Sequence, residues 1–410
     1  MNYKIISKCR CCDSENLKEV LDLKTQPLAN SYHDGDDKLE VYPLKLNVCT
    51  KCFHSQLSVV VSPDKMFEHY LYRSGIPKTF NQYCEWFSEL VEMENGIGSV
   101  LDIACNDGTQ LQKFKNRGWK TYGIDPAKNL YEWSSKIADR VVSSYFNKES
   151  IKELGQNTYN VITAQNVFAH IDDVDSFLQN CKSIMNDNTR LYIQTSQADM
   201  IENSQFDTIY HEHLSFFSTK SMKTLCQKNG LYLVYVRKVD IHGGSYVFTI
   251  MKSDKQKNDS VEENLLIEEK AGRYSIDTYI EYSSNIVKLI SKCKDIIQDY
   301  TNKGYLIVGY GAAAKGNTFL NFSNIKPHFI IDDNKLKHNK LTPGSNCIVV
   351  DKEFIKLLAN NVLFIPLSWN FYDEIKLQIQ TSLTCNKFMN NFSCDILRYY
   401  PTINIEHIKK

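Results

Sequence analysis

The chain has 410 residues, of which 42% are hydrophobic and 23% charged, a composition typical of a globular protein with more than one domain. Its 48 lysines and arginines balance 48 aspartates and glutamates, so bulk charge does not favour binding to nucleic acid or to an anionic membrane. No apolar run is long enough to span a bilayer, and the opening MNYKIISKCR lacks the apolar core of a signal peptide. We therefore expect a cytoplasmic protein with no membrane partner.

Residues 1–75 are expected to form a small zinc-binding domain. The motifs Cys9-x-x-Cys12 and Cys49-x-x-Cys52 supply four thiolates, the usual tetrahedral ligand set of Zn(II). Cys11 is a rival ligand, but it lacks the x-x spacing that wraps two sulfurs around one ion. Four thiolates leave no open coordination position, so the metal is expected to be structural. A nucleic-acid-binding zinc ribbon is the alternative, and no run of Lys and Arg supports it.

Residues 76–255 alternate short apolar runs with helical patterns, which predicts a Rossmann-like α/β domain with a parallel sheet. A helix is expected between Gly108 and Gly118. The expected strands lie in 99–108, 119–126, 160–170 and 189–196.

The turn in LDIACNDGT has the position of a nucleotide-cofactor site. Asp102 ends the strand, Gly108 lies in the turn, and Asp125 ends the next strand, where an acid suits a ribose diol. The turn is not G-x-G-x-x-G, so the pyrophosphate of NAD fits it poorly. S-adenosylmethionine has no phosphate and carries an ammonium group that acids can hold. The turn therefore favours S-adenosylmethionine, and a purely structural turn is the alternative.

Residues 256–410 are expected to form a second Rossmann-like α/β domain. A long charged helical stretch is predicted over 261–302, followed by strand patterns in 304–317, 327–334 and 361–370. GYGAAAK resembles a dinucleotide fingerprint, with Asp332 in the position of an acid that reads ribose. An NAD-dependent oxidoreductase is therefore a rival interpretation.

The stretch FDTIYHEHLSFFS crowds Tyr210, His211, Glu212 and His213 against apolar residues. It predicts a metal site, a proton-transfer site or a polar kink. The metal interpretation lacks a third ligand nearby, and the motif is not H-E-x-x-H on a helix. Histidine has the pKa that a general base needs near neutral pH, which favours proton transfer.

The chain resembles the S-adenosylmethionine-dependent sugar C-methyltransferases, which act on nucleotide-linked 4-keto-6-deoxy sugars. The motifs that carry the resemblance follow one another in order along essentially the whole chain: CRCC, VLDLKTQPLANSY, YPLKLNVCTKCFHSQL, YLYRSG, LDIACNDGT, NVFAHI, FDTIYHEHLSFFS, HGGS, GYGAAAKGNT and SWNFYDEI. The resemblance implies a zinc-binding domain, a methyltransferase Rossmann domain and a C-terminal Rossmann-like domain that helps to bind the sugar nucleotide.

Three positions depart from the family pattern. Ala104 replaces a glycine of the cofactor turn, and Phe216 stands where the family often has tyrosine. Tyr246 and Val247 follow HGGS where the family commonly has Leu-Arg, and loss of that arginine bears on how the sugar is held.

The resemblance also implies roles for individual residues. His213 is the expected general base, and His211 is expected to make a structural hydrogen bond. The other catalytic candidates are Tyr210, Glu212, His170 and Tyr72. The cofactor candidates are Asp102, Ala104, Asn106, Asp107, Gly108, Asp125, Pro126 and Asn166. The substrate candidates are His242, Gly243, Gly244, Ser245, Gly311, Ala312, Lys315, Asn317, Asp332, Trp369 and Asn370. The zinc ligands are Cys9, Cys12, Cys49 and Cys52.

The expected reaction is methylation of a sugar carbon next to the keto group, with carbon 3 favoured over carbon 5. An O-methyltransferase is the alternative within the same cofactor class. A zinc-ribbon scaffold that retains an inactive Rossmann core is the non-enzyme alternative. Whether the chain is a monomer or a homodimer is left open by the sequence.

Overall fold

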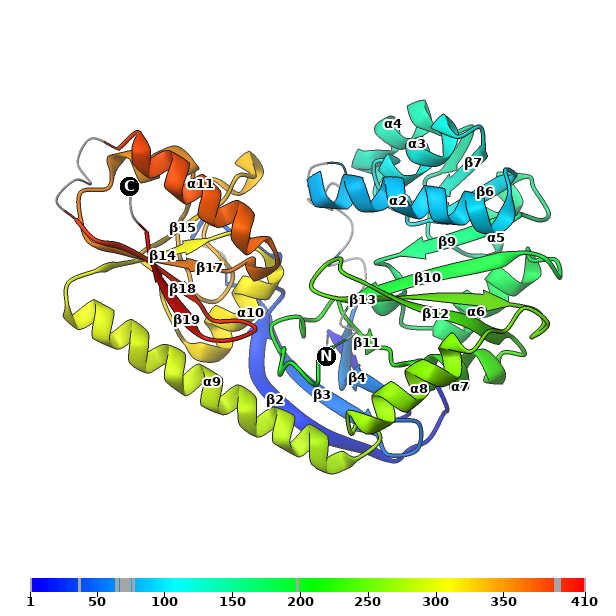
Figure 1. Cartoon of the computed structure of the whole chain (residues 1–410), viewed down its shortest axis with the longest axis horizontal. Helices are drawn as coiled ribbons and strands as arrows, with labels where there is room; N and C mark the ends of the chain where they lie inside the picture. The colour runs from blue at the N-terminus through cyan, green and yellow to red at the C-terminus, as the bar shows by residue number, and fades with distance from the viewer. Residues whose placement is uncertain are drawn as a thin grey trace. The chain divides into compact units, whose positions relative to one another are not determined.

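The computed structural model describes residues 2–35, 38–62, 66, 75, 78–196, 199–386 and 392–408 (Figure 1). By its internal contacts the chain divides into two compact units, whose segments alternate along the sequence. Unit 1 comprises Met1–Glu19, Asn47–Asp199 and Glu212–Ser275, and unit 2 comprises Val20–Leu46, Met200–His211 and Ile276–Lys410. This division reflects contacts in space, whereas the domain boundaries at 1–75, 76–255 and 256–410 were inferred from the sequence pattern. Those boundaries therefore stay a prediction.

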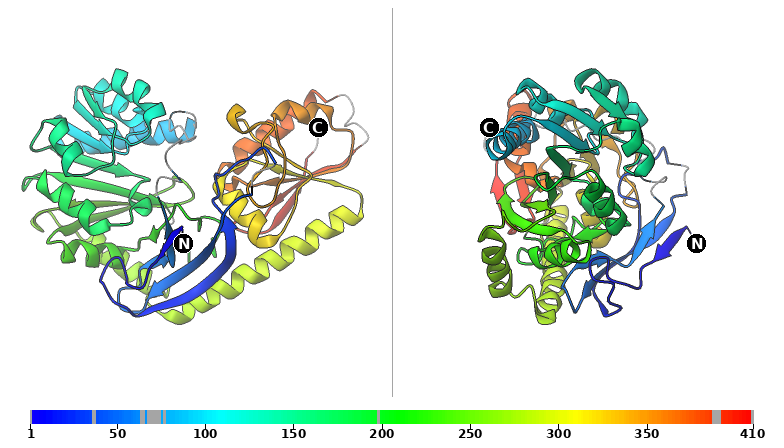
Figure 2. Two further views of the ribbon diagram at one scale, coloured as in Figure 1. Left: turned by 180° about the vertical axis from the view of Figure 1, so that it is seen from behind. Right: turned by 90° about the vertical axis from the view of Figure 1, so that its right-hand side faces the viewer.

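Unit 1 is built on a seven-stranded sheet in the order β12-β13-β10-β9-β6-β7-β8 (Figures 1 and 2). Neighbours from β10 to β8 are parallel, and β13 is antiparallel to both β10 and β12. The strands are β6 (Ser99–Ile103), β7 (Lys120–Ile124), β8 (Arg140–Val142), β9 (Val161–Gln165), β10 (Arg190–Ser196), β12 (Tyr232–Val239) and β13 (Ser245–Met251). The helices are α2 (Lys78–Asn95), α3 (Thr109–Asn116), α4 (Lys128–Ile137), α5 (Lys148–Leu154), the 3-10 helix η1 (Phe168–His170), α6 (Val174–Ser183), α7 (Thr219–Lys228) and α8 (Ser260–Lys270).

Both faces of this sheet are buried, because successive strand residues point to opposite faces. Val100 and Val161 belong to a core that also contains apolar residues of α2 and α3. Their chain neighbours Leu101 and Ile162 belong to a second core, with apolar residues of α6 and α7. Polar side chains that could contact a ligand are therefore expected at the ends of the strands.

The N-terminal strands form two further sheets. The first pairs β1 (Tyr3–Ile5) with β5 (Val59–Val61) in antiparallel fashion. The second has the order β11-β4-β3-β2. Its members are β2 (Leu17–Pro27), β3 (Val41–Cys49), β4 (Ser55–Leu57) and β11 (Ser215–Phe216). β2 and β3 each begin in one unit and end in the other.

Unit 2 contains a six-stranded sheet in the order β16-β15-β14-β17-β18-β19, parallel except for the pair β18–β19. The strands are β14 (Leu306–Tyr310), β15 (Phe329–Ile331), β16 (Val349–Val350), β17 (Val362–Pro366), β18 (Cys394–Arg398) and β19 (Asn404–His407). The helices are α9 (Ile276–Asn302), α10 (Ala314–Ser323), α11 (Tyr372–Thr384) and the 3-10 helices η2 (Lys335–Lys337), η3 (Lys352–Leu357) and η4 (Trp369–Phe371). The predicted α/β class, with two Rossmann-like sheets behind a cysteine-bearing N-terminal segment, is confirmed.

The helical stretch predicted over 261–302 is interrupted once. It contains two helices, α8 and α9, which belong to different units. The chain between them contains Gly272, whose φ of 78° is left-handed and ends the first helix. Charged residues continue through the break, so charge and period alone did not reveal it.

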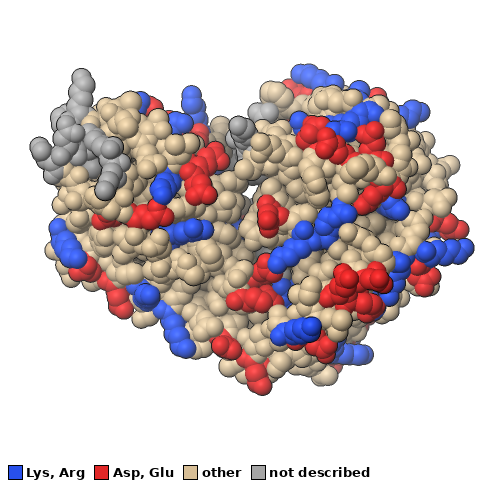
Figure 3. Space-filling model, in the orientation of Figure 1, with Lys and Arg blue, Asp and Glu red and all other residues tan. Residues whose placement is uncertain are grey.

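Two further features concern the charge of the surface and the apolar character of the helices. Acidic and basic side chains are interspersed on the face drawn in Figure 3. Among the described residues, no helix combines the length and the apolar character needed to cross a membrane.

Candidate functional site

The four cysteines of the two Cys-x-x-Cys motifs lie together, with their Sγ atoms within 4.8 Å of one another. The Sγ atoms of Cys9 and Cys52 are 3.5 Å apart, and those of Cys12 and Cys49 are 3.6 Å apart. Zn–S bonds of about 2.3 Å in a tetrahedron place sulfurs roughly 3.8 Å apart, so this group fits Zn(II). The predicted grouping is confirmed.

The two cysteine motifs share one backbone conformation. The N–H of Asp13 donates to Cys9 O at 2.9 Å, and the N–H of Phe53 donates to Cys49 O at 2.9 Å. Asp13 and Phe53 have φ values of 58° and 57°, respectively. This repetition identifies two equivalent knuckles, and Cys11, although buried, stays outside the group of four.

The predicted cofactor turn follows β6. Asp125, at the end of β7, accepts hydrogen bonds from the N–H of Asn106 and of Ala127, each at 2.8 Å. Burial raises the pKa of Asp125, and these two N–H groups oppose that shift. Each carboxylate oxygen has two lone pairs, so both oxygens retain one with which to accept a ribose hydroxyl.

The turn itself is held in an uncommon backbone conformation. Ala104 and Asn106 have φ values of 61° and 51°, and Asn166, which follows β9, has a φ of 53°. Left-handed backbone at non-glycine residues costs of order 1–2 kcal/mol each and clusters at functional sites. Ala104, which stands where the family has glycine, therefore adopts the conformation that glycine would favour.

Other cofactor candidates have mainly structural partners. Asp107 accepts hydrogen bonds from the hydroxyl of Thr109 at 2.6 Å and from the N–H of Gly75 at 3.1 Å, at the start of α3. Asp102 accepts a hydrogen bond from the Thr163 hydroxyl at 2.6 Å, and burial raises the pKa of Asp102 to about 7. Pro126 follows Asp125 directly and is partly exposed.

Two histidines of unit 1 form a pair. The rings of His170 and His213 have their centroids 5.0 Å apart. Nδ1 of His170 lies 2.7 Å from Glu212 O, and the N–H of Leu214 donates to Ala169 O at 2.8 Å. In this contact Nδ1 of His170 donates to the Glu212 carbonyl, and the backbone carbonyl of Asn166 is a second partner of the ring. Burial lowers the pKa of His170, so the ring is neutral at pH 7.

His211 has a different environment, although it lies two residues before His213. Its Nε2 lies 3.2 Å from Pro43 O, and its ring meets Tyr42 edge-on at 5.7 Å. Burial lowers the pKa of His211 to about 4. These contacts support the structural role predicted for His211. Tyr210 and His211 belong to unit 2, whereas Glu212 and His213 belong to unit 1; Tyr72 lies outside the described residues.

The HGGS turn has three successive left-handed residues, with φ of 55° at His242, 86° at Gly243 and 100° at Gly244. Ser245, the first residue of β13, accepts a hydrogen bond from Nε2 of Gln194 at 2.7 Å. Oε1 of the same Gln194 accepts from the N–H of Asn166 at 3.0 Å.

Gln194 thus joins the ends of β9 and β13, yet it was not predicted as a site residue. A glutamine inside the apolar run of TRLYIQTS was the available signal.

The second glycine turn, in unit 2, has the same backbone hydrogen-bond frame as the first: an aspartate at the end of the next strand accepts two backbone N–H groups. Asp332 accepts the N–H of Ala312 at 2.7 Å and the N–H of Asn334 at 2.8 Å. It differs in one respect, because Lys337 Nζ lies 3.4 Å from Asp332 Oδ2 and donates to Ala312 O at 2.7 Å. Tyr32, whose hydroxyl also donates to Ala312 O, and Lys337 were not predicted.

Lys315 and Trp369 lie together beside a carboxylate that was not predicted. Lys315 Nζ is 4.7 Å from the Trp369 ring centroid, and Trp369 Nε1 donates to Asp207 Oδ2 at 2.6 Å. Burial lowers the pKa of Lys315, and the Asp207 carboxylate opposes that shift. Gly311 has a φ of 90°, and a Cβ there would lie 2.5 Å from Ser368 Oγ.

Two further substrate candidates lie on helices of unit 2. Asn317 Nδ2 donates to Ala29 O at 2.7 Å, and Asn370 belongs to η4.

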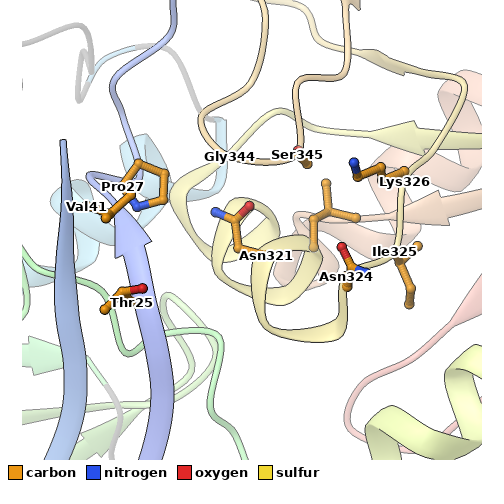
Figure 4. Close-up of a pocket in the computed structure, with 10 residues that line it drawn as sticks. Thr25, Pro27, Val41, Asn321, Asn324, Ile325, Lys326, Gly344 and Ser345 are labelled. Atoms are coloured by element: carbon orange, nitrogen blue, oxygen red, sulfur yellow. The ribbon is translucent and has the colours of Figure 1, made fainter. Parts of the chain in front are cut away.

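A pocket elsewhere in unit 2 contains none of the predicted substrate residues. It lies around the C-terminal end of α10, with Asn321, Asn324, Lys326 and Gly344 among its lining residues (Figure 4). Phosphates bind where helix N–H groups converge, at the opposite end of a helix. The pocket therefore does not argue for a nucleotide.

Three family models match adjoining parts of the chain. A zinc binding domain matches residues 9–67, a methyltransferase domain matches 76–236, and a C-methyltransferase C-terminal domain matches 240–389.

Curated relatives and a solved structure add to these matches. The C-methyltransferase NovU of Streptomyces niveus is 28% identical over 386 residues, which cover 90% of this chain and 91% of that protein. A ubiquinone biosynthesis O-methyltransferase of Bradyrhizobium diazoefficiens is 24% identical over 27% of this chain and 46% of its own length. Among solved structures, magnesium protoporphyrin IX methyltransferase of Synechocystis with bound S-adenosylmethionine is similar over 42% of this chain and 79% of its own. The TM-score is 0.33 and the sequence identity 11%, and both values are too low to support a functional inference.

The three models follow the order expected from the resemblance, and NovU matches along nearly the whole of both chains. The chain has the domain set of the S-adenosylmethionine-dependent C-methyltransferases that carry an N-terminal zinc-binding domain, and it is similar to one of them along nearly its whole length.

Proposed function

We propose that the protein methylates a carbon next to the keto group of a nucleotide-linked 4-keto-deoxysugar, with carbon 3 favoured over carbon 5. The observation that carries this proposal is the pair His170–His213, whose ring centroids lie 5.0 Å apart. Methylation of a hydroxyl needs at most a local base, whereas methylation of carbon requires removal of a C–H proton first. A histidine pair beside the methyltransferase sheet suits the second task.

In this mechanism His213 accepts the proton from the carbon next to the ketone, which leaves an enolate. His170 remains neutral because burial lowers its pKa, so it does not repel the imidazolium that forms on His213. Glu212 contributes its backbone carbonyl, which holds His170 by Nδ1. Tyr210 and Tyr72 are proposed to orient the sugar. S-adenosylmethionine supplies the electrophilic methyl group.

The cofactor is proposed to bind at the turn after β6. Asp125 accepts the ribose hydroxyls, while Ala104, Asn106, Gly108 and Asn166 shape the surrounding backbone. Asp102, Asp107 and Pro126 are proposed to support this turn.

The HGGS turn in unit 1 is proposed to contact the sugar. In unit 2, Gly311, Ala312, Lys315 and Asp332 are proposed to hold the nucleotide, together with Asn317, Trp369 and Asn370. Helix N–H groups and a lysine would stabilise the negative charge of a diphosphate.

An O-methyltransferase is the second candidate, since two O-methyltransferases match about a third of the chain or less. An NAD-linked oxidoreductase would use the Asp332 turn, and calorimetric titration with NAD and with S-adenosylhomocysteine separates the two cofactors. A cytoplasmic location, the absence of nucleic-acid binding and a monomer or homodimer stay predictions.

The zinc centre is expected to be structural. Cys9→Ser removes one of four thiolates, so zinc content measured by atomic absorption should fall well below one per chain and the melting temperature should fall with it. Cys11→Ser is the matched control, because Cys11 lies outside the group of four, and it should retain the metal. Parent protein purified without stoichiometric zinc would contradict this assignment.

Asp125→Ala should weaken binding of S-adenosylhomocysteine at least tenfold in a calorimetric titration. Two charge-assisted hydrogen bonds are worth on the order of 2–4 kcal/mol, which allows a larger loss. Asp332→Ala is the matched control, because it removes the same backbone hydrogen-bond frame from the other turn and should leave this affinity unchanged. An unchanged affinity in Asp125→Ala would mean that the cofactor site is elsewhere.

His213→Ala should slow exchange of the substrate C–H for deuterium in heavy water by roughly two to four orders of magnitude, the usual contribution of a positioned base. Methylation should slow equally, while affinity for S-adenosylhomocysteine stays the same. His211→Ala, in protein shown to fold, should keep much more exchange, because His211 contacts only structural groups. If the parent shows no exchange at all, an oxygen acceptor becomes the better interpretation.

A further inference from the structure

The first zinc knuckle reaches the segment that carries His170. Arg10, which follows the ligand Cys9, is buried, with 4% of its side chain exposed, and its Nη1 lies 2.6 Å from Asp172 Oδ1. The same Nη1 also donates to Asp172 O. His170 is the last residue of η1, and Asp172 lies two residues after it. The first knuckle is therefore connected directly to the segment that carries His170.

The second knuckle reaches the segment that carries His213. His54, two residues after the ligand Cys52, is completely buried, and its Nε2 lies 3.2 Å from Ser215 Oγ. Ser215 lies two residues after His213 and pairs with Gln56 where β4 meets β11. The N–H of Leu57 donates to Leu214 O at 3.0 Å, which extends this connection by one more hydrogen bond.

Gln56 joins the two knuckles to each other. Its Oε1 accepts the N–H of Arg10 at 2.9 Å, and its Nε2 donates to Lys8 O at 3.0 Å. The zinc-bearing backbone, Arg10, Gln56 and β11 are therefore connected by direct hydrogen bonds within unit 1.

We propose that the zinc knuckles position the histidine pair, with Arg10 and His54 as positioning residues that act on His170 and His213 through Asp172 and Ser215. The inference rests on the proton-transfer role proposed for this pair. Four metal–thiolate bonds fix the separation of the knuckles, and each knuckle holds one histidine segment by its own contact. A displacement of about 1 Å at a reacting group can cost a hundredfold in rate. Small shifts of the knuckles would therefore lower the rate of proton transfer.

Arg10→Met tests the first connection, because it keeps the length of the side chain and removes the charge and the donors. Zinc content and affinity for S-adenosylhomocysteine should stay within twofold of the parent, while deuterium exchange of the keto sugar slows at least tenfold. Arg10→Lys should recover most of the exchange, since lysine can still donate to Asp172. Lys4→Met is the matched control: Lys4 pairs with the same Asp172 at 3.5 Å but is 69% exposed, and its loss should change nothing.

His54→Leu tests the second connection, with His54→Gln as the variant that keeps a side-chain hydrogen-bonding group for Ser215. Exchange should slow in His54→Leu and recover in His54→Gln. Exchange at the parent rate in both Arg10→Met and His54→Leu would overturn the proposal. A parallel loss of zinc, cofactor affinity and exchange in these variants would also overturn it, because it would show general destabilisation.

A second measurement does not depend on the substrate. Backbone amide exchange is followed by mass spectrometry in the parent before and after zinc is removed with a chelator. Peptides that cover 168–172 and 212–217 should exchange at least tenfold faster without zinc, whereas 109–137, in α3 and α4, should not change. Acceleration confined to residues 2–61 would overturn the coupling even if the keto sugar proves to be the substrate. Failure of the parent to exchange substrate protons would instead overturn the proposed function and leave this result to decide the coupling.

Discussion

A hydrogen bond from a turn to the acid at the end of the next strand organises both Rossmann-like sheets. In unit 1 the N–H of Asn106 donates to Asp125, and in unit 2 the N–H of Ala312 donates to Asp332. Each acid also accepts an N–H two residues further on, from Ala127 or from Asn334. Because both faces of the unit 1 sheet are covered by apolar cores, these strand ends are where polar groups can be kept in defined positions.

The two turns differ in the charges around the same frame. Among the described residues, the hydrogen bonds to Asp125 come from backbone N–H groups, whereas Asp332 also has the ammonium group of Lys337 at 3.4 Å. A carboxylate without a cation beside it suits neutral ribose hydroxyls. A lysine within the frame suits a ligand that brings negative charge, as a nucleotide diphosphate does. The difference agrees with the proposal that the first turn binds a cofactor without phosphate and the second a substrate with phosphate.

The histidine segments depend on contacts that lie far away in sequence. Asp172 and Ser215 receive side chains from residues near the N-terminus, and the ring of His170 is fixed by a carbonyl of the other segment. A base is effective only if its lone pair is held toward the proton that it removes. Zinc coordination would add rigidity to short segments that contain little regular structure, which is the physical basis of the coupling proposed between the cysteine knuckles and the histidine pair.

The sequence by itself determined the zinc ligands, the strand–turn–helix units and the acids at the strand ends, because these depend on spacing, period and turn chemistry within a few residues. It did not reveal the break between α8 and α9, since charge continues through Gly272. It also did not reveal Arg10, Gln194 or Asp207, whose partners lie dozens to hundreds of residues away. The different surroundings of His211 and His213 follow from which distant strand or loop each ring meets, and no local pattern encodes that. Only the tertiary structure brings such partners together, because a long-range contact depends on the path of the whole chain between them.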